Sequence, residues 1–392
     1  MVELLAPAGD LEKLKYALIY GADAVFIGGE DFSLRSRASN FSIEKIKEAT
    51  TFAHNLGKKV YVTTNIIPHQ EDLKGLKEYL EKLEEANVDA IICASPYIIA
   101  TALKHTNLEV HLSTQQSALN TPTLHYWRDL GVKRIVLGRE LSLEEIKELP
   151  LNEIDLEVFI HGGMCMSYSG RCALSNNLAA RDANRGGCAH SCRWEYKLHQ
   201  NKELISPEIF SISSKDLSAV NEIKALVNSG VKSLKIEGRM KSLHYIATVT
   251  KTYRMLIDDL DKNPNLTDFQ KYRQEIAKAE NRLLENGYLD GNFGPSKQLY
   301  EFTGEKPNQA FVGLVIDFDQ DSMVATIEQR NNFGIDDNIE IFSPHNDNKV
   351  FILDNLKDDE GNDLKRARHA QQIVQVKMPF IVDKYSILRK VL

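Results

Sequence analysis

The 392-residue sequence predicts an α/β fold, a TIM-like (β/α)8 barrel followed by a small all-β domain. Three observations predict it. Short apolar runs alternate eight times with longer amphipathic ones, and the apolar runs suit parallel strands that are buried on both faces. After the barrel region the pattern changes to short β runs alone. We expect the barrel over residues 1–260, a helical connector over 261–307 and a β-barrel-like domain over 308–392.

The strands and helices of the predicted barrel follow one another in order. A strand over 2–9 precedes a helix that ends at Gly21, and a strand over 22–29 precedes a helix that is closed by Gly57. After a strand over 58–65, a helix places four leucines on one face: Leu73, Leu76, Leu80 and Leu83. Further strands are expected over 88–95, 108–117, 132–141, 156–163 and 231–239, and a long helix over 243–260.

The C-terminal region contains short β runs separated by Asn, Asp and Gly. This spacing predicts a small barrel or sandwich of about 80 residues. Such a module often binds RNA or a protein partner, and the fold alone does not decide between them. The runs cover 311–318, 322–329, 338–344, 349–355, 372–377 and 385–392.

An insertion over residues 163–216 separates the seventh and eighth strands. It holds four of the five cysteines, spaced C-x6-C-x15-C-x3-C, and a predicted hairpin over 195–205 with Asn201 near its turn. Because the insertion leaves the C-terminal end of a barrel strand, it lies on the face where barrel active sites form. The four cysteines are Cys165, Cys172, Cys188 and Cys192, whereas Cys93 stands apart in an apolar run.

Four interpretations of these cysteines are open. Disulfides need an oxidising compartment, and unrelated buried cysteines seldom cluster in this way. Structural zinc sites usually contain two C-x2-4-C pairs, and here only Cys188 and Cys192 form one. Converging thiolates also bind iron-sulfur clusters, and the glycines nearby let backbone fold tightly around an inorganic core. We favour an iron-sulfur cluster, with zinc as the alternative.

The remaining composition limits the class of protein. The start of the chain has neither a basic nor an apolar leader, and no apolar run approaches the roughly 20 residues that cross a bilayer, so we expect a cytoplasmic protein without a membrane span. The net charge of −7 argues against nucleic-acid binding through a bulk positive field. A local basic patch remains open, since several cations cluster near the eighth strand: Lys232, Lys235, Arg239 and Lys241.

Polar residues follow most of the predicted strands and should converge on the barrel mouth. Arginines held there bind carboxylates or phosphates bidentately, which indicates a small polyanion or an RNA backbone as ligand. A structural role is open for each residue: His161 as a core histidine, and the charged residues as ion pairs around the rim. The residues concerned are Arg35, Arg37, Asn65, Gln115, Gln116, Arg139, Glu140, His161, Glu237 and Arg239.

Motifs of several enzyme classes are missing from the sequence. It contains no G-x-S-x-G elbow and no H-E-x-x-H, so serine hydrolases and zincins lack their usual residues. A Walker A motif and a well-placed G-x-G-x-x-G are also missing, which argues against a nucleoside triphosphate or a dinucleotide.

The segment EVFIHGGMCMSYSGRCALS resembles the collagenase-like peptidase U32 family. ELLAPAG, GADAVFIGG, NFS, RELSLEEI, SSKDL and SLKIEGRMKS resemble further segments of that family in the same order, over roughly residues 2 to 255. Gly163 and Met164 depart mildly from the family pattern. Members that are similar in length and domain order are prephenate-dependent tRNA uridine hydroxylases, which make 5-hydroxyuridine at the wobble position without oxygen.

The resemblance implies that the four clustered cysteines hold a 4Fe-4S cluster and that prephenate, a dicarboxylate, is the co-substrate. We expect Arg139, His161 and Glu237 to act in catalysis, and three arginines to bind the co-substrate: Arg35, Arg171 and Arg239. tRNA would be the partner, with a paralogous protein subunit as a second one. The alternatives are a collagenase-like peptidase, a hydroxylase of another RNA or of a small aromatic compound, and a noncatalytic RNA-binding component.

Overall fold

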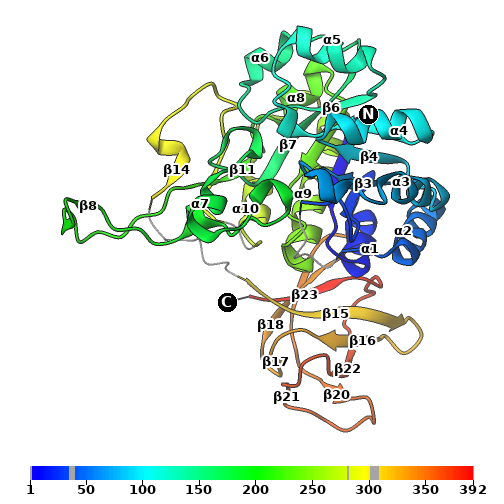
Figure 1. Ribbon diagram of the computed structural model, residues 1–392. Helices are drawn as coiled ribbons and strands as arrows, with labels where there is room; N and C mark the ends of the chain where they lie inside the picture. The colour runs from blue at the N-terminus through cyan, green and yellow to red at the C-terminus, as the bar shows by residue number, and fades with distance from the viewer. Residues whose placement is uncertain (1, 35–39, 280–281, 301–308, 392) are drawn as a thin grey trace.

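The computed structural model describes residues 2–34, 40–279, 282–300 and 309–391. In these residues a barrel of parallel strands carries a separate antiparallel β domain below α1 and α9 (Figure 1). No helix of the described chain is both long enough and apolar enough to cross a membrane. The barrel strands are β1 Glu3–Pro7, β2 Ala24–Gly28, β3 Lys59–Thr64, β4 Ala90–Cys93, β5 Glu109–Leu112, β6 Arg134–Val136, β7 Asp155–Gly163 and β12 Ser233–Ile236.

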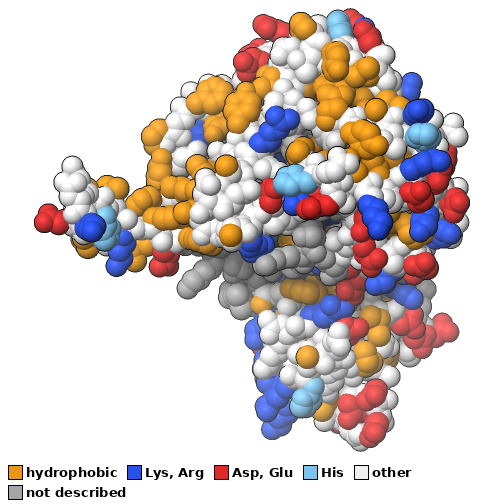
Figure 2. Space-filling view, viewed as in Figure 1, with side chains coloured by type: hydrophobic (Ala, Val, Ile, Leu, Met, Phe, Trp, Pro, Cys, Tyr) orange, Lys and Arg blue, Asp and Glu red, His pale blue; other side chains and the backbone are white. Residues whose placement is uncertain are grey.

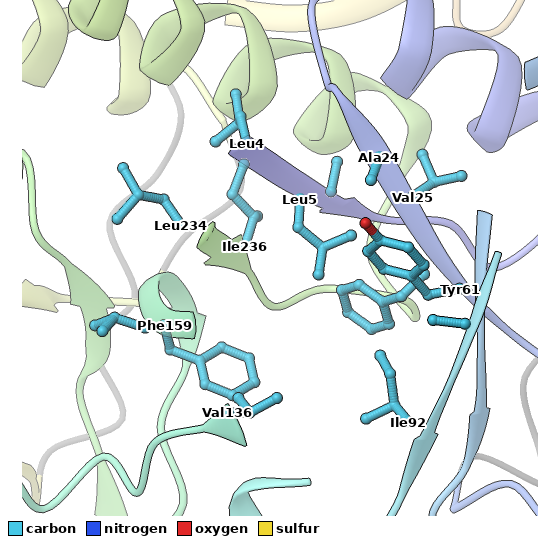
Figure 3. Packing of buried hydrophobic residues seen from close by; sticks show 14 of the residues in the cluster. Leu4, Leu5, Ala24, Val25, Tyr61, Ile92, Val136, Phe159, Leu234 and Ile236 are labelled. Atoms are coloured by element: carbon cyan, nitrogen blue, oxygen red, sulfur yellow. The ribbon is translucent and has the colours of Figure 1, made fainter. Parts of the chain in front are cut away.

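The strands close into a ring. Each pairs in parallel with the next along the chain from β1 to β7, and β12 pairs in parallel with both β7 and β1. Apolar side chains fill the inside of the ring and the space between the ring and the helices; Leu4 and Leu5 of β1 lie near Ile236 of β12 (Figure 3). The predicted (β/α)8 barrel is therefore confirmed.

Helices with polar N-caps connect the strands. Asp10 and Ser42 each accept a hydrogen bond from the backbone N–H three residues later. The leucine face predicted for the third helix is shortened, because Gly75 has a positive φ of 77° and leaves Leu73 in a separate 3-10 turn. The helices are α1 Leu11–Ile19, α2 Ile43–Asn55, α3 Leu76–Glu85, α4 Pro96–His105, α5 Thr121–Asp129, α6 Leu143–Lys147, α8 Ile223–Ser229 and α9 Leu243–Lys262.

The insertion is mostly irregular. Its helical parts are the short helix α7 Leu174–Ala179 and the 3-10 turns η3 Tyr168–Gly170, η4 Ala183–Arg185 and η5 Ser191–Arg193. It returns to the barrel through β11 Asp216–Ser218, which pairs antiparallel with β7. We call residues 163–193 the cysteine loop.

The hairpin predicted within the insertion is present. It consists of β8 His199–Gln200 and β9 Glu203–Leu204, and positive φ angles at Asn201 and Lys202 form its turn. It projects away from the barrel at the left of Figure 1. Apolar side chains are exposed along it and at its base (Figure 2): Trp194, Leu198, Leu204 and Ile205.

The segment expected to be a helical connector contains strands as well. In the described part of residues 261–307, α9 ends at Lys262, and α10 Gln270–Ile276 and the 3-10 turn η6 Pro295–Lys297 follow. After α10, β13 Leu284–Glu285 pairs with β11, and β14 Gln298–Leu299 pairs with β10 Ser213–Ser214. The connector therefore braces the end of the insertion.

The C-terminal domain is all-β, as predicted. One antiparallel sheet has the order β19-β18-β23-β15-β16-β22-β20, and a second, two-stranded sheet pairs β17 with β21. The strands are β15 Gln309–Asp319, β16 Val324–Gln329, β17 Phe333–Gly334, β18 Asn338–Phe342, β19 Lys349–Ile352, β20 Lys357–Asp358, β21 Arg366–Ala367, β22 Ile373–Lys377 and β23 Ile387–Val391.

The β domain is fastened to the barrel by a buried interface. The Tyr20 hydroxyl of α1 lies 2.8 Å from the carbonyl oxygen of Phe342 and 2.9 Å from that of Tyr385. Arg389 of β23 is fully buried and donates to Glu340 and to Glu275 of α10 at 3.0 and 2.6 Å. These contacts place the β domain firmly under the barrel.

Candidate functional site

A cavity of about 220 Å³ opens at the C-terminal ends of the barrel strands. Its lower wall is formed by apolar and charged side chains from inside the barrel, and its rim by the cysteine loop. The structure thus places the insertion over the mouth of the barrel, as expected from its position after the seventh strand. The barrel residues that line the cavity include Phe26, Thr63, Asn65, Ile92, Gln115, Arg139, Glu140, Phe159, Lys235, Glu237 and Arg239.

All four clustered cysteines line this cavity: Cys165, Cys172, Cys188 and Cys192. They are not joined by disulfides, and Cys165 is exposed whereas the other three are partly buried. Cys93 is fully buried at the end of β4, with its sulfur 2.9 Å from Thr64 Oγ1. The structure therefore separates the four cysteines from the fifth.

The electrostatic setting of the four thiols differs between positions. Burial raises the pKa of Cys192, Arg193 opposes the rise, and repulsion from Cys165 and Cys188 adds to it. Burial would also raise the pKa of Cys172, but hydrogen bonds from the Ser167 hydroxyl and from backbone N–H groups outweigh it and lower that pKa. N–H groups directed at a thiolate also stabilise one that is bound to a metal.

The chemistry of the four thiols allows either of two centres. In the described chain, no three or more Cys, His, Asp or Glu side chains are grouped as the ligands of a metal ion. A tetrahedral zinc ion, with Zn–S distances of about 2.3 Å, requires sulfurs within about 4 Å of one another. In a 4Fe-4S cluster each thiolate binds a different iron, so the sulfurs surround a larger centre. All four thiols line one cavity and none is in a disulfide, so thiolate ligands for either centre are present.

The cysteine loop is shaped by tight backbone turns. His190 and Gly186 both have positive φ, 54° and 97°. A Cβ atom at Gly187 would lie 2.7 Å from the carbonyl oxygen of Asp182, so only glycine fits there. Asn184 holds Cys172 by accepting from its N–H at 3.4 Å and donating to its carbonyl at 3.1 Å. The loop therefore positions its cysteines through backbone contacts.

Two ionic contacts fasten the cysteine loop to the barrel. Glu140 accepts hydrogen bonds from the Ser169 N–H at 2.5 Å and from its hydroxyl at 3.0 Å. Arg185 binds both carboxylate oxygens of Asp72 at 2.7 Å and so lowers the pKa of Asp72. Glu140 therefore has a positioning role.

Arg239 and Arg139 approach the cavity from either side of β7. Arg239 is 4% exposed and donates to Thr63 Oγ1 and Ser33 Oγ, each at 3.1 Å. A Cβ atom at Gly28 would lie 1.8 Å from its guanidinium, so glycine is required there. Arg139 donates to the carbonyl oxygen of Gly163 at 2.6 Å, and its guanidinium carbon lies 3.8 Å from the centre of the Phe159 ring.

The other predicted residues have different positions. Glu237 lines the cavity, and its backbone oxygen accepts a hydrogen bond from Tyr245 at 3.0 Å. Arg171 is exposed on the cysteine loop and is not part of the cavity lining. Arg35 and Arg37 lie outside the described residues.

His161 is buried away from the cavity. Its Nδ1 lies 3.2 Å from the Tyr253 hydroxyl of α9. The pairing of β7 with β12 shifts by one residue between Phe159 and His161, so a β-bulge reverses the alternation of side chains there. Phe159 faces the cavity and His161 faces the helix, which is the structural role left open for it above.

The structure adds Lys235 to the site. This residue is 4% exposed, lines the cavity, and places its Nζ 2.7 Å from Glu157 Oε1 and 4.6 Å from the centre of the Phe26 ring. In the sequence it looks like one member of a basic surface cluster. Its position in the sequence could have indicated burial, because it lies between Leu234 and Ile236 in an apolar strand. Side chains alternate along a strand, so Lys235 faces the opposite side from these two residues, which is the inside of the barrel.

Comparisons with known proteins agree with this geometry. Residues 9–298 match the model of peptidase family U32, and residues 307–389 match its C-terminal domain. A tRNA hydroxylation protein of Bacillus subtilis is 45% identical over 99% of this chain and 94% of its own. A 23S rRNA 5-hydroxycytidine C2501 synthase of Escherichia coli is 38% identical over 74% of this chain and 43% of its own. A collagenase of Porphyromonas gingivalis is 29% identical over 87% of this chain and 86% of its own.

Proposed function

This chain belongs to peptidase family U32, and on that premise we propose that it is an RNA-modifying enzyme, a hydroxylase of tRNA. The similarity to the tRNA hydroxylation protein extends over nearly the whole of both chains, including the β domain. The rRNA 5-hydroxycytidine synthase supports the same reaction class on a second RNA.

The finer proposal is that the enzyme converts the wobble uridine to 5-hydroxyuridine with prephenate as oxygen donor, in the cytoplasm where tRNA is found. One observation carries it: the four clustered cysteines and two arginines, Arg139 and Arg239, line the same cavity. A redox centre and a binding site for an organic anion would then share one small space, as a hydroxylation driven by an organic co-substrate requires.

We assign a 4Fe-4S cluster to the four cysteines of the loop. A bound cluster of this kind supplies one-electron transfer. The chain contributes thiols, a rigid backbone and N–H donors, of which those directed at Cys172 favour its thiolate form. Arg193, which lines the cavity beside Cys192, would offset the negative charge of a thiolate-bound centre.

The arginines bind the carboxylates of prephenate. Arg239 holds its guanidinium against two hydroxyls, and Arg139 against a backbone carbonyl and an aromatic ring, so both are fixed before a ligand arrives. Apolar side chains between them, such as Phe159 and Ile92, would pack against the ring of the co-substrate. Arg35 and Arg171 stay predictions for this role.

The base enters from the rim. A wobble nucleotide lies in a single-stranded loop, so it reaches the cavity without the opening of a duplex. Glu237 lines the cavity and is the group we propose to accept the proton that C5 of uracil loses. The carbon of prephenate that gives up its hydroxyl oxygen takes up a proton in exchange, so uracil is oxidised by two electrons and the co-substrate is reduced by two. His161 has no assigned role in the reaction, because its imidazole packs on α9.

Mass spectrometry of tRNA nucleosides tests the reaction. We expect 5-hydroxyuridine and its derivatives to be lost from a deletion strain, to return with the wild-type gene, and to form in vitro from purified chain, prephenate and tRNA. Unchanged modification in the deletion strain would contradict the proposal. Activity of the purified chain alone would also show that a paralogous subunit is dispensable.

Metal analysis of protein prepared without oxygen tests the cluster. We expect about four irons and four sulfides per chain and a brown colour. One zinc ion per chain and no sulfide would support the alternative. An assay of the same preparation on gelatin tests the collagenase-like alternative, which predicts cleavage.

A further inference from the structure

One of the most buried polar groups in the cavity lining is the side chain of Gln115, which follows β5 and is 3% exposed. Its Oε1 accepts two hydrogen bonds, from Ser113 Oγ at 2.9 Å and from Asn65 Nδ2 at 3.2 Å. Asn65 is itself oriented by the Leu34 N–H, which donates to Asn65 Oδ1 at 3.3 Å. This chain of donors fixes which end of the Gln115 amide is the oxygen.

The amide nitrogen of Gln115 is available to bind a ligand. Gln115 Nε2 is buried and has no hydrogen-bond partner in the described structure. A buried donor without an acceptor costs free energy, and an ordered water or a ligand can supply the missing acceptor. Because both Oε1 contacts already come from donors, rotation of the amide cannot satisfy Nε2. The cavity therefore presents a fixed donor that needs an acceptor oxygen.

A second buried polar group, the side chain of Lys235, lines the same cavity. The Lys235 ammonium uses one of its three N–H groups on Glu157 and lies above the Phe26 ring. Like Gln115, it is almost fully buried inside the barrel. Apolar side chains accompany both residues in the lining: Phe26, Ile92, Val136 and Phe159. An ammonium, an amide donor and an apolar surface suit an organic acid that carries a carboxylate, an uncharged oxygen and a ring.

The burial of these groups favours one of two ligands. A base that is joined to an RNA chain enters through the rim, where the backbone must remain outside. A free small acid meets no such restriction and reaches the interior of the barrel. The buried donors are therefore better placed for the co-substrate than for the nucleotide.

We propose that Gln115 and Lys235 form the inner half of the co-substrate site, with Lys235 binding a carboxylate and Gln115 Nε2 binding an acceptor oxygen of the same molecule. This rests on the proposed function for the identity of the acid. The co-substrate lies inside the barrel, beneath the cysteine loop, and the base lies at the rim. Gln115 then determines specificity, because acids without the second oxygen leave its donor unsatisfied.

Isothermal calorimetry with prephenate on anaerobically prepared protein tests the assignment. We expect Gln115→Met, which keeps the length of the side chain and removes the donor, to weaken prephenate binding about tenfold or more. Phenylpyruvate, which lacks the ring carboxylate and hydroxyl of prephenate, should bind weakly to the wild type and lose little in the variant. Affinity for tRNA should not change.

Gln116→Met is the matched control. The Gln116 amide belongs to the same 3-10 turn, η2 Thr114–Gln116, but donates to the backbone oxygen of Ala94 and does not line the cavity. It should leave prephenate binding unchanged, and thermal melting of both variants verifies folding.

The possible results separate the two proposals. If the wild type binds prephenate and Gln115→Met binds it equally well, the assignment of Gln115 is wrong and the proposed function stands. Loss of tRNA affinity with prephenate affinity intact would show that Gln115 reads the base instead. If the wild type does not bind prephenate at all, both the co-substrate and this subsite are overturned.

Discussion

The two ends of the barrel contain equally buried arginines with different partners. Arg134, at the N-terminal end, is 6% exposed and lies 2.5 Å from a carboxylate oxygen of Glu3 and 3.5 Å from one of Glu157. Arg239, at the mouth, is 4% exposed and donates to the hydroxyls of Thr63 and Ser33. The contacts described for Arg134 are with carboxylates, whereas those described for Arg239 include two neutral hydroxyls.

This difference indicates which end of the barrel serves folding and which serves chemistry. A buried arginine that is paired with carboxylates has its charge compensated, and removing it leaves the carboxylates buried without a partner. Hydrogen bonds to neutral hydroxyls orient a guanidinium without cancelling its charge. The two arginines are similarly buried, and the difference described here lies in the carboxylates around Arg134 and the hydroxyls beside Arg239.

The largest effect that we expect comes from replacing a cysteine at the barrel mouth, compared with replacing the cysteine in the barrel wall. Cys188→Ser should abolish cluster binding and lower tRNA hydroxylation about 100-fold or more, because the thiolate is a ligand at the mouth. Cys93→Ser makes the same change inside the barrel wall and should leave iron content and activity unaltered. Iron analysis and product mass spectrometry on both variants measure this. Equal iron loss in both would remove the distinction between the two settings.

The paired arginine substitutions sharpen the comparison. Arg134→Met should lower the free energy of unfolding by about 3 kcal/mol, because it leaves buried carboxylates without a partner. Arg239→Met should leave more of the stability intact and lower activity about 100-fold, since the co-substrate loses an anchor. Denaturant unfolding and initial rates, measured on the same preparations, give both quantities.

The opposite result would break the comparison. If Arg134→Met inactivates a protein of unchanged stability, the N-terminal end takes part in the reaction. If Arg239→Met unfolds the protein instead, the hydroxyl contacts at the mouth are structural.

The smallest effect is a dependence of stability on pH. Burial would raise the pKa of Glu157, but attraction from Lys235 and Arg134 outweighs it and holds that pKa below its usual value. This stabilisation is present above the pKa of an unfolded glutamate, about 4.3, and is lost as the pH falls through the lower folded value. We expect Glu157→Gln to be less stable than the wild type at pH 7 and to lose less stability as the pH falls from about 5 to below the folded pKa of Glu157. Parallel pH profiles for the two proteins would contradict this.

The barrel could be predicted because its signal is repeated and local. Apolar runs of strand length alternate with helices whose N-caps, such as Asp10 and Ser42, are visible in the sequence. Closure needs no further signal once eight units are present. The strands β13 and β14 were missed, because two-residue strands pair with distant partners and have no pattern of their own.

The site was predicted less completely. The cysteine spacing identified the loop, and the barrel rule placed Arg139, Glu237 and Arg239 at the mouth, where they line the cavity. His161 was misplaced by a single bulge, which reverses the side-chain alternation and leaves no mark on composition. The role of Lys235 could not be predicted for two reasons. A basic residue near other basic residues looks exposed, and its partner Glu157 is 78 positions away in the sequence.

The interface between the barrel and the β domain has a consequence for cooperativity. Arg389 bridges Glu340 of the β domain and Glu275 of α10, and Tyr20 of the barrel binds backbone oxygens in the β domain. Detaching the domain would strand these charged and polar groups, so neither part can melt without exposing the other. Heat should therefore unfold the chain in one transition. An RNA that contacts both parts would find them held at a constant separation.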